Sequence, residues 1–265
     1  MSTPMTPGAT SAAGRLLLVP NALDLGAEPV DICQVLPLGV LQHAAALGHW
    51  LAEDARSTRA FLKRVHAVMP LRLALQAIDI RELPRPAKGG GAAGAAPAFE
   101  AWRELLAPAL AGHDLGLISE AGLPAVADPG AAAVAAAHAL GLPVLPLPGA
   151  SSLMMALAAS GLNGQSFAFV GYLPQDAAQR SARLKELQAV SRRSGQTQLL
   201  IETPYRNATL LKALVETLAD DTRLSVSCGL SLPSGWTRTD RIAGWCQRPA
   251  QMPDRVPAVF AFLAD

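Results

Sequence analysis

The sequence predicts an α/β fold with two domains, the first on a mostly parallel sheet and the second on a mixed sheet. Strand-like and helix-like segments alternate up to about residue 148, as in right-handed βαβ units. Beyond about residue 165, several strand-like segments are joined by connections too short for a crossover, so antiparallel pairing is needed. Apolar residues form 51% of the 265 but aromatic residues only 5%, which favours close-packed helices over an aromatic-rich β-sandwich.

The N-terminal domain is expected at residues 15–148, after a small, polar, proline-containing tail at 1–14 that does not have the pattern of a signal peptide. Residues 71–80 show neither the helical nor the strand pattern of apolar residues. The Gly/Ala-rich segment at 86–98 is interpreted as a surface loop. The remaining elements are expected as strands at 16–20, 49–54, 114–119 and 142–147, and as helices at 30–46, 59–68 (with Ser57 as N-cap), 99–111 and 131–140.

The C-terminal domain is expected at residues 149–265. Its first helix follows a Pro-Gly turn and should span 153–160. The further expected elements are strands at 167–173, 198–202, 224–230, 236–245 and 258–263, and helices at 177–191 and 207–219.

Composition and spacing argue against several classes of protein. The net charge of +1 gives the whole molecule no strong field for nucleic acid, although a local basic patch is compatible with it. The cysteines Cys33, Cys228 and Cys246 are odd in number and far apart, and the histidines form no HExxH pair, so neither a disulfide framework nor a metal site is expected. The Gly-x-Gly-x-x-Gly spacing at 89–94 follows no strand and is discounted as a dinucleotide motif. The alanine-rich stretches are too interrupted to span a membrane, so a cytoplasmic protein is expected.

Two consecutive strands of the N-terminal domain end in loops of small residues and proline. Because ligands bind beyond the carboxyl ends of strands in open α/β sheets, these loops are candidates for a binding site. Glu120 supplies a carboxylate there, and Gly122 and Gly149 would let the backbone approach a ligand closely. Ser151 offers a hydroxyl at the start of a helix. On spacing alone, the two loops are equally well explained as ordinary βα turns that bind no ligand. In that case Asp128 would cap the next helix.

At these loops the sequence resembles the tetrapyrrole (corrin/porphyrin) methylase family. The paired motifs are SEAGLPAVADPG at 119–130 and LPLPGASSLMMALAASGL at 145–162. The resemblance is greatest to the branch that methylates the ribose 2′-hydroxyl of small-subunit ribosomal RNA. Other matching segments follow in the right order: LLLVP at 16–20, AEDARSTRAFLKR at 52–64, GYLP at 171–174 and IETPYRN at 201–207.

The resemblance implies a two-domain fold with S-adenosylmethionine in a cleft between the domains, a homodimer, and no metal. Methyl transfer from a sulfonium is an in-line displacement, so the protein must chiefly position the donor and acceptor and exclude water. Carried over by position, the cofactor-binding residues are Pro20, Ser119, Glu120, Ala121, Gly122, Leu123, Ser151, Ser152, Cys228 and Pro257.

The carboxylates best placed to act as a base towards a ribose hydroxyl are Asp54 and Glu202. The alternative for each is a structural ion pair, with Arg56 or Arg59 for Asp54 and with Arg206 for Glu202. The residues expected to bind the acceptor are Arg56, Arg59, Tyr172, Tyr205 and Arg206.

A basic stripe supports RNA as the acceptor. Arg56, Arg59, Lys63 and Arg64 fall at i, i+3, i+7 and i+8, on one helix face that could contact phosphates. A solvated helix face explains the same spacing.

Departures from the family pattern leave two alternatives open: methylation of a tetrapyrrole or other small molecule, and a non-catalytic module that binds S-adenosylmethionine. The family's Thr-Pro-Ile-Gly-Asn is replaced by the segment at 21–25, and its His-Asn-rich stretch by that at 81–98. Glu120 replaces the usual Asp, and Tyr205 stands where the RNA enzymes tend to have His.

Overall fold

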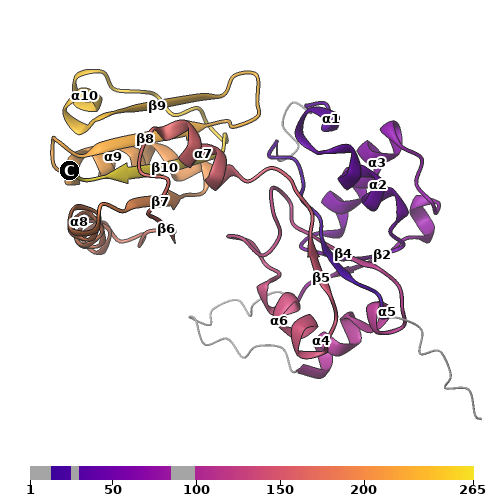
Figure 1. Cartoon of the computed structure of the whole chain (residues 1–265). Coiled ribbons are helices and arrows are strands. Elements are labelled where there is room, and N and C mark those ends of the chain that lie inside the picture. Colours follow the sequence, from indigo (N-terminus) through magenta and orange to yellow (C-terminus); the bar gives the residue numbers. More distant parts are fainter. Residues whose placement is uncertain (1–12, 25–29, 85–98) are drawn as a thin grey trace, which may run out of the picture. The chain divides into compact units, whose positions relative to one another are not determined.

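A computed structural model describes residues 13–24, 30–84 and 99–265 (Figure 1). The described residues form two compact units, one of residues 13–24, 31–84 and 99–150, the other of residues 151–265 together with Val30. Each unit has its own five-stranded sheet, parallel in the first and mixed in the second, which confirms the predicted fold class. Most of the expected tail and all of the segment at 86–98 lie outside the described residues.

The sheet of the first unit has the strand order β3-β2-β4-β1-β5 with all neighbours parallel. The four predicted strands are confirmed, and one further strand, β3, emerges from the segment that fitted neither periodicity. The strands are β1 (Leu16–Leu18), β2 (His49–Ala52), β3 (Asp79–Glu82), β4 (Leu115–Ile118) and β5 (Val144–Pro146).

The helices of the first unit depart from prediction at four points, one of which is that the helix predicted at 99–111 is interrupted at Leu106. The single helix predicted at 30–46 is broken at Pro37, because the residue before a proline avoids helical dihedrals and Leu36 is extended. Asp54 rather than Ser57 caps the next helix, and Gly130 rather than Asp128 begins the one after the β4 loop. The helices are α1 (Ile32–Val35), α2 (Leu38–Ala46), α3 (Ala55–Val68), the 3₁₀ turn η1 (Leu75–Ala77), α4 (Phe99–Leu105), α5 (Ala107–Leu110) and α6 (Ala131–Ala139).

These helices cover both faces of the first sheet. Successive residues of a strand point to opposite faces, so Leu17 packs with the α1–α3 side and Leu16 with the α4–α6 side. The connection after β1 therefore runs over one face and the connection after β4 over the other, although β1 and β4 are neighbours in the sheet (Figure 1). Such a reversal marks the place where open α/β sheets bind ligands.

The sheet of the second unit has the order β6-β7-β10-β8-β9, in which only β6 and β7 pair in parallel. The strand predicted at 236–245 is wrong in its second half. The residues from Ile242 onward form a short helix instead. Residues three apart lie on the same face of a helix, so Ile242 and Trp245 both bury their side chains. The elements are β6 (Phe167–Gly171), β7 (Thr197–Ile201), β8 (Arg223–Cys228), β9 (Trp236–Arg241), β10 (Ala258–Leu263), α7 (Ser152–Ser160), α8 (Ala177–Ser194), η2 (Pro204–Arg206), α9 (Asn207–Thr217) and α10 (Ile242–Gln247).

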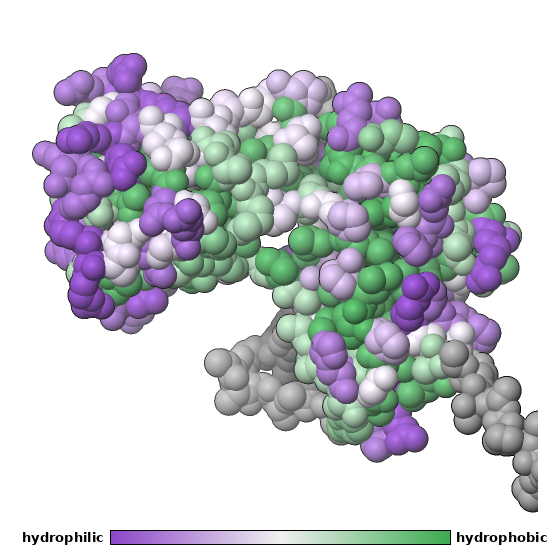
Figure 2. Space-filling view, in the orientation of Figure 1, coloured by the Kyte–Doolittle hydropathy of each residue, from purple (hydrophilic) through white to green (hydrophobic). Residues whose placement is uncertain are grey.

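The second sheet is also covered on both faces, by α7 on one side and by α8, α9 and α10 on the other. Helix α8 buries Leu184 and Leu187 and leaves most of its charged residues exposed, which gives the hydrophilic surface over this helix in Figure 2. Among the described residues, none of the helices has the length and apolar character needed to cross a membrane.

Candidate functional site

The carboxyl edge of the first sheet brings the N-terminal site residues together. Since all five strands are parallel, the segments that follow β1, β2 and β4 leave the sheet at the same edge, and β4 lies between the other two. Pro20 follows β1, Asp54 follows β2, and the predicted cofactor segment at 119–123 follows β4. The topology therefore places these sequence-distant residues side by side.

Asn21, which departs from the family pattern, holds the loops after β1 and β4 together. Its backbone pairs with that of Gly122 as an isolated antiparallel bridge, with N–O distances of 2.9 and 3.2 Å. Its buried amide donates to the carbonyl oxygens of Ser119 and Glu120 at 3.2 and 2.9 Å. The sequence analysis missed this role because Asn21 matched no motif. The departure thus supplies a contact that fixes the Glu120 loop.

Two glycines of these loops are required for different reasons. Gly122 has φ of +66°, and a Cβ there would make only ordinary contacts, 3.4 Å from Leu23 and 3.7 Å from the Ala150 oxygen. A left-handed backbone therefore explains this glycine. At Gly149 a Cβ would lie 2.3 Å from Cγ of Pro20, which leaves no space for it. The loop after β5 is in direct contact with the first strand's proline.

Three carboxylates gather where β2 and β4 end. The backbone N–H of Glu120 donates to Oε2 of Glu53 at 3.1 Å. Burial, together with the negative charges of Glu53 and Glu120, raises the pKa of Asp128 to about 7. Within the described ranges, no group of histidine, cysteine or acidic side chains is arranged to hold a metal ion. Glu53 and Glu120 thus make the edge negative, while Asp128 is partly protonated near neutral pH, and the edge suits an organic cation.

Asp128→Asn should stabilise the protein above pH 7 and leave it nearly unchanged near pH 4. A raised folded-state pKa means that the folded protein holds the proton more tightly than the unfolded chain does. The stabilisation by the proton is full below the unfolded pKa, about 3.9, and is lost as the pH rises through about 7. The shift corresponds to at most about 4 kcal/mol, and solvent screening should reduce the gain to roughly 1–2 kcal/mol.

Urea unfolding at pH 4.5 and pH 8.0 measures this gain, with the exposed Asp254→Asn as the matched control. Equal gains for Asp128→Asn at the two pH values would contradict the assignment.

Asp54 begins α3 as its capping residue. Its Oδ1 accepts from the backbone N–H of Ser57 at 2.7 Å, and its carbonyl accepts from the Ser57 and Thr58 hydroxyls. The carboxylate is thus engaged in the first turn of the helix. In the structure its observed role is that of an N-cap.

The basic face of α3 has fewer exposed cations than the sequence spacing predicted. Arg64 pairs with the buried carboxylate of Asp24 at 2.9 Å and ties the loop after β1 to α3. Arg56, Arg59 and Lys63 are exposed. Three cations rather than four are therefore presented to solvent.

The second sheet gathers the C-terminal site residues at one edge. Strands β6, β7 and β8 end at this edge and β10 begins there, since Ala258 pairs with Cys228 and Val259 with Ile201. The candidates at this edge are Tyr172, Glu202, Tyr205, Arg206, Cys228 and Pro257.

Glu202 organises the turn that follows β7. Its Oε1 accepts from the Arg206 side chain at 2.7 and 3.1 Å and from the backbone N–H of Thr203 at 2.7 Å. The hydrogen bond to Glu202, and the nearby Glu202, Tyr205 and Tyr172, raise the pKa of Arg206. The ion pair that was the alternative to a base for Glu202 is therefore present.

Two exposed aromatic rings flank this ion pair. The Tyr205 side chain is 74% exposed and that of Tyr172 56% exposed. The Arg206 guanidinium carbon lies 5.5 Å from the centre of the Tyr205 ring. An arginine beside exposed rings offers planar surfaces on which a base or another flat molecule could stack.

The remaining candidates of the second unit contribute differently. Cys228 points into the hydrophobic core, and burial raises the pKa of its thiol. Because this thiol is buried, any polar contact from Cys228 to a ligand would come from its backbone. Ser151 is the N-cap residue of α7 without a side-chain capping bond, and Ser152 is the first residue of that helix.

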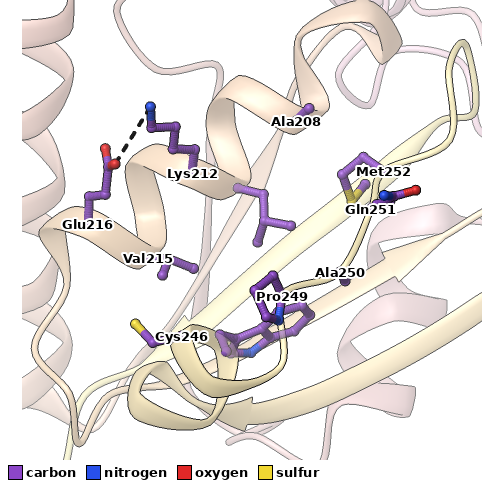
Figure 3. A pocket seen from close by; sticks show the side chains of 11 residues that line it. Ala208, Lys212, Val215, Glu216, Cys246, Pro249, Ala250, Gln251 and Met252 are labelled. Atoms are coloured by element: carbon purple, nitrogen blue, oxygen red, sulfur yellow. Dashed lines mark ion pairs between the residues drawn. The ribbon is translucent and has the colours of Figure 1, made fainter.

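An apolar groove of about 680 Å³ lies elsewhere in the second unit, between α9 and the segment after α10 (Figure 3). Leu211, Val215 and the Trp245 ring form part of its lining, and Lys212 and Glu216 pair across one turn of α9 at 3.7 Å. None of the predicted site residues lines it. No motif pointed to this groove, because its residues come from two separate helices and a loop.

Comparison with known proteins agrees with this architecture. No model of a protein family matches the chain. A protein named Ribosomal RNA small subunit methyltransferase I, from Mesorhizobium japonicum, is 34% identical over 205 residues, which cover 77% of this chain and 62% of that protein. The chain thus spans about three fifths of the length of this relative.

Solved structures share the fold at low sequence identity. Diphthine synthase superposes with a TM-score of 0.59 at 14% identity, covering 95% of this chain and 90% of that one. Uroporphyrin III C-methyl transferase from Thermus thermophilus gives 0.51 at 19% identity, covering 94% and 97%. The predicted resemblance is confirmed at two levels: the sequence is similar to a protein named Ribosomal RNA small subunit methyltransferase I, and the fold is that of a uroporphyrin III C-methyl transferase.

Proposed function

We propose that this chain, with the fold of the tetrapyrrole methylases and a sequence similar to a ribosomal RNA small subunit methyltransferase, is an S-adenosylmethionine-dependent RNA methyltransferase. The observation that carries the proposal is the collinear similarity over 205 residues. The acceptor proposed is a ribose 2′-hydroxyl of small-subunit ribosomal RNA. Such an acceptor would place the protein in the cytoplasm.

The negative edge of the first sheet supports a cationic methyl donor. S-adenosylmethionine carries a sulfonium and an ammonium group, and the carboxylates of Glu53, Glu120 and Asp128 gather where β2 and β4 end. A preorganised negative site attracts such a cation before any contact forms. When bound, the cofactor supplies an activated methyl group.

The residues of this chain have positioning roles in that reaction. Asn21 fixes the Glu120 loop, and the contact between Pro20 and Gly149 holds the loops after β1 and β5 together. Rigid loops keep donor and acceptor in line, which is the main requirement for a displacement at carbon. Because Glu202 is held by Arg206 and Thr203, we propose that it orients Arg206 towards the acceptor.

The edge of the second sheet supports an acceptor with flat groups. Exposed Tyr172 and Tyr205 with Arg206 would stack on unpaired bases, as in other single-stranded RNA sites. A tetrapyrrole would also stack there, so this second candidate is kept on the same observation.

The purified protein should bind S-adenosylmethionine or its demethylated product at one per chain without added metal. Calorimetry measures the binding, and transfer of labelled methyl to small ribosomal subunits, followed by nucleoside analysis, measures the reaction. Label in a 2′-O-methylnucleoside would support the proposal. Binding without transfer to RNA or to a tetrapyrrole would favour the non-catalytic module, and folded protein that binds neither ligand would refute the cofactor assignment.

We also propose a homodimer, on family resemblance alone. Light scattering at micromolar concentration should give twice the mass of the chain. A monomer mass would contradict it.

Charge reversal at Arg56 and Arg59 should weaken RNA binding and flatten its dependence on salt, because fewer counterions are released when fewer phosphates are contacted. Two lost contacts should reduce the slope of log K against log salt by about 2. The charge reversal of Arg183, exposed on α8, is the control. An unchanged slope for Arg56→Glu/Arg59→Glu would indicate a solvated helix face.

A further inference from the structure

A polar cavity lies at the amino edge of the first sheet, opposite the edge that carries the predicted cofactor loops. Its volume is about 280 Å³, and three of the five histidines of the chain line it. His43 comes from α2, His49 begins β2, and His113 comes shortly before β4. Arg72, in the segment after α3, lines the same cavity. None of these residues belongs to the loops at the carboxyl edge.

The imidazoles are close enough to act on one ligand. The His49 and His113 rings are 5.4 Å apart between centres. Nδ1 of His49 is buried, lies 3.6 Å from Oδ2 of Asp79 and has no hydrogen-bond partner among the described residues. A buried ring nitrogen without a partner favours a ligand or water that supplies one.

One carboxylate, that of Asp114, lines the cavity, and that of Asp79 lies beside His49; an arginine pairs with each of them. Asp114 accepts from the Arg15 side chain at 2.6 and 3.2 Å, and this pairing lowers the pKa of Asp114. Asp79 accepts from the Arg81 side chain at 3.0 Å. His66 on α3 accepts from the N–H of Leu71 and does not line the cavity.

Arg72, by contrast, has no ion pair in the part of the chain that the structure describes. Its backbone N–H donates to the Ala45 carbonyl at 2.8 Å, which holds the segment against α2. Its guanidinium reaches back over Gly48, with Nη2 3.7 Å from the point where a Cβ would stand. The cavity therefore has one unmatched permanent cation and three groups that gain charge on protonation.

We propose that this cavity binds a phosphate group, held by Arg72 and by the protonated imidazoles of His43, His49 and His113. A guanidinium binds phosphate oxygens in a forked geometry, and ionised donors form the stronger hydrogen bonds. An imidazole that carries a proton on both nitrogens donates two hydrogen bonds and a neutral one donates only one, so phosphate should bind more tightly at acidic than at alkaline pH. The volume also leaves room for part of an ester group, so either free phosphate or the backbone of an RNA could supply the ligand.

Inorganic phosphate, titrated at pH 6.0 and pH 8.0, is the first probe. The ring carbon–proton signals of the histidines report on it, after assignment with single His→Gln variants. We expect phosphate to shift the signals of His43, His49 and His113, with affinity roughly tenfold weaker at pH 8.0. Arg72→Gln should weaken binding roughly tenfold at pH 6.0, and Arg103→Gln on α4 is the matched control. No shift at pH 6.0, or equal affinity in the folded Arg72→Gln protein, would overturn the proposal.

A ten-residue oligouridylate distinguishes the two sources of phosphate. If it shifts the same signals at lower concentration than phosphate does, and Arg72→Gln abolishes the difference, the ligand is an RNA backbone. If only inorganic phosphate shifts them, the ligand is a free phosphate or phosphate monoester. Both probes are read without methyl donor, so the result stands whether or not the proposed methyl transfer is found.

Discussion

Gly149→Ala should lower the free energy of unfolding by about 2–3 kcal/mol and weaken binding of S-adenosylmethionine roughly tenfold or more. The added methyl group would lie 2.3 Å from Cγ and 2.5 Å from Cβ of Pro20. A proline ring cannot rotate out of the way, so the loops after β1 and β5 must separate. Because the loop after β1 also holds Gly122 through Asn21, the displacement should reach the proposed cofactor site.

Urea unfolding and calorimetry measure the two effects. Gly39→Ala on α2 is the matched control, because a Cβ there would meet nothing within 4 Å. It should leave the free energy of unfolding unchanged or raise it by up to about 1 kcal/mol. Normal stability and normal cofactor affinity in Gly149→Ala would show that the contact with Pro20 is not rigid.

Glu202→Ala should lower the free energy of unfolding by about 2–3 kcal/mol and reduce methyl transfer roughly tenfold or more. The change removes the acceptor for Arg206 and for Thr203, and leaves a guanidinium without its carboxylate. Arg206 would then be free to leave the acceptor edge.

Two further variants separate the roles of Glu202. Glu202→Gln keeps an oxygen for the Thr203 N–H but loses the ionic pairing with Arg206. Compared with Glu202→Ala, it should therefore restore more of the free energy of unfolding than of the methyl-transfer rate. Glu216→Ala removes an exposed ion pair on α9 and should change stability by no more than about 0.5 kcal/mol. Full turnover in folded Glu202→Ala would refute the positioning role of this carboxylate.

Hydrophobic pattern predicted most strands because most are buried apolar runs bounded by proline, glycine or charge. β3 escaped prediction because two of its four residues are acidic and one is arginine, so no alternation of a buried face is visible. The break at Pro37 was readable from local rules, whereas α10 depended on tertiary contacts. There Trp245 donates to the Leu224 carbonyl, a partner 21 residues away.

The sequence was sufficient to predict which residues meet at each sheet edge. Parallel topology brings the segments after β1, β2 and β4 together, and the matching motifs name the residues. The contacts within the edge were not predictable, because they join distant positions. Asn21 reaches carbonyls 98 and 99 residues away, and Asp128 owes its raised pKa partly to Glu53 on another strand's loop.

The strand order of the second sheet determines when that unit can fold during synthesis. Its central strand is β10, which pairs on both sides although it is the last strand in sequence. Until residues 258–263 have left the ribosome, β6–β7 and β8–β9 are two separate pairs with open edges that can associate with other chains. The sheet of the first unit is complete once β5 is made, so the second unit keeps open strand edges until a later stage of synthesis than the first.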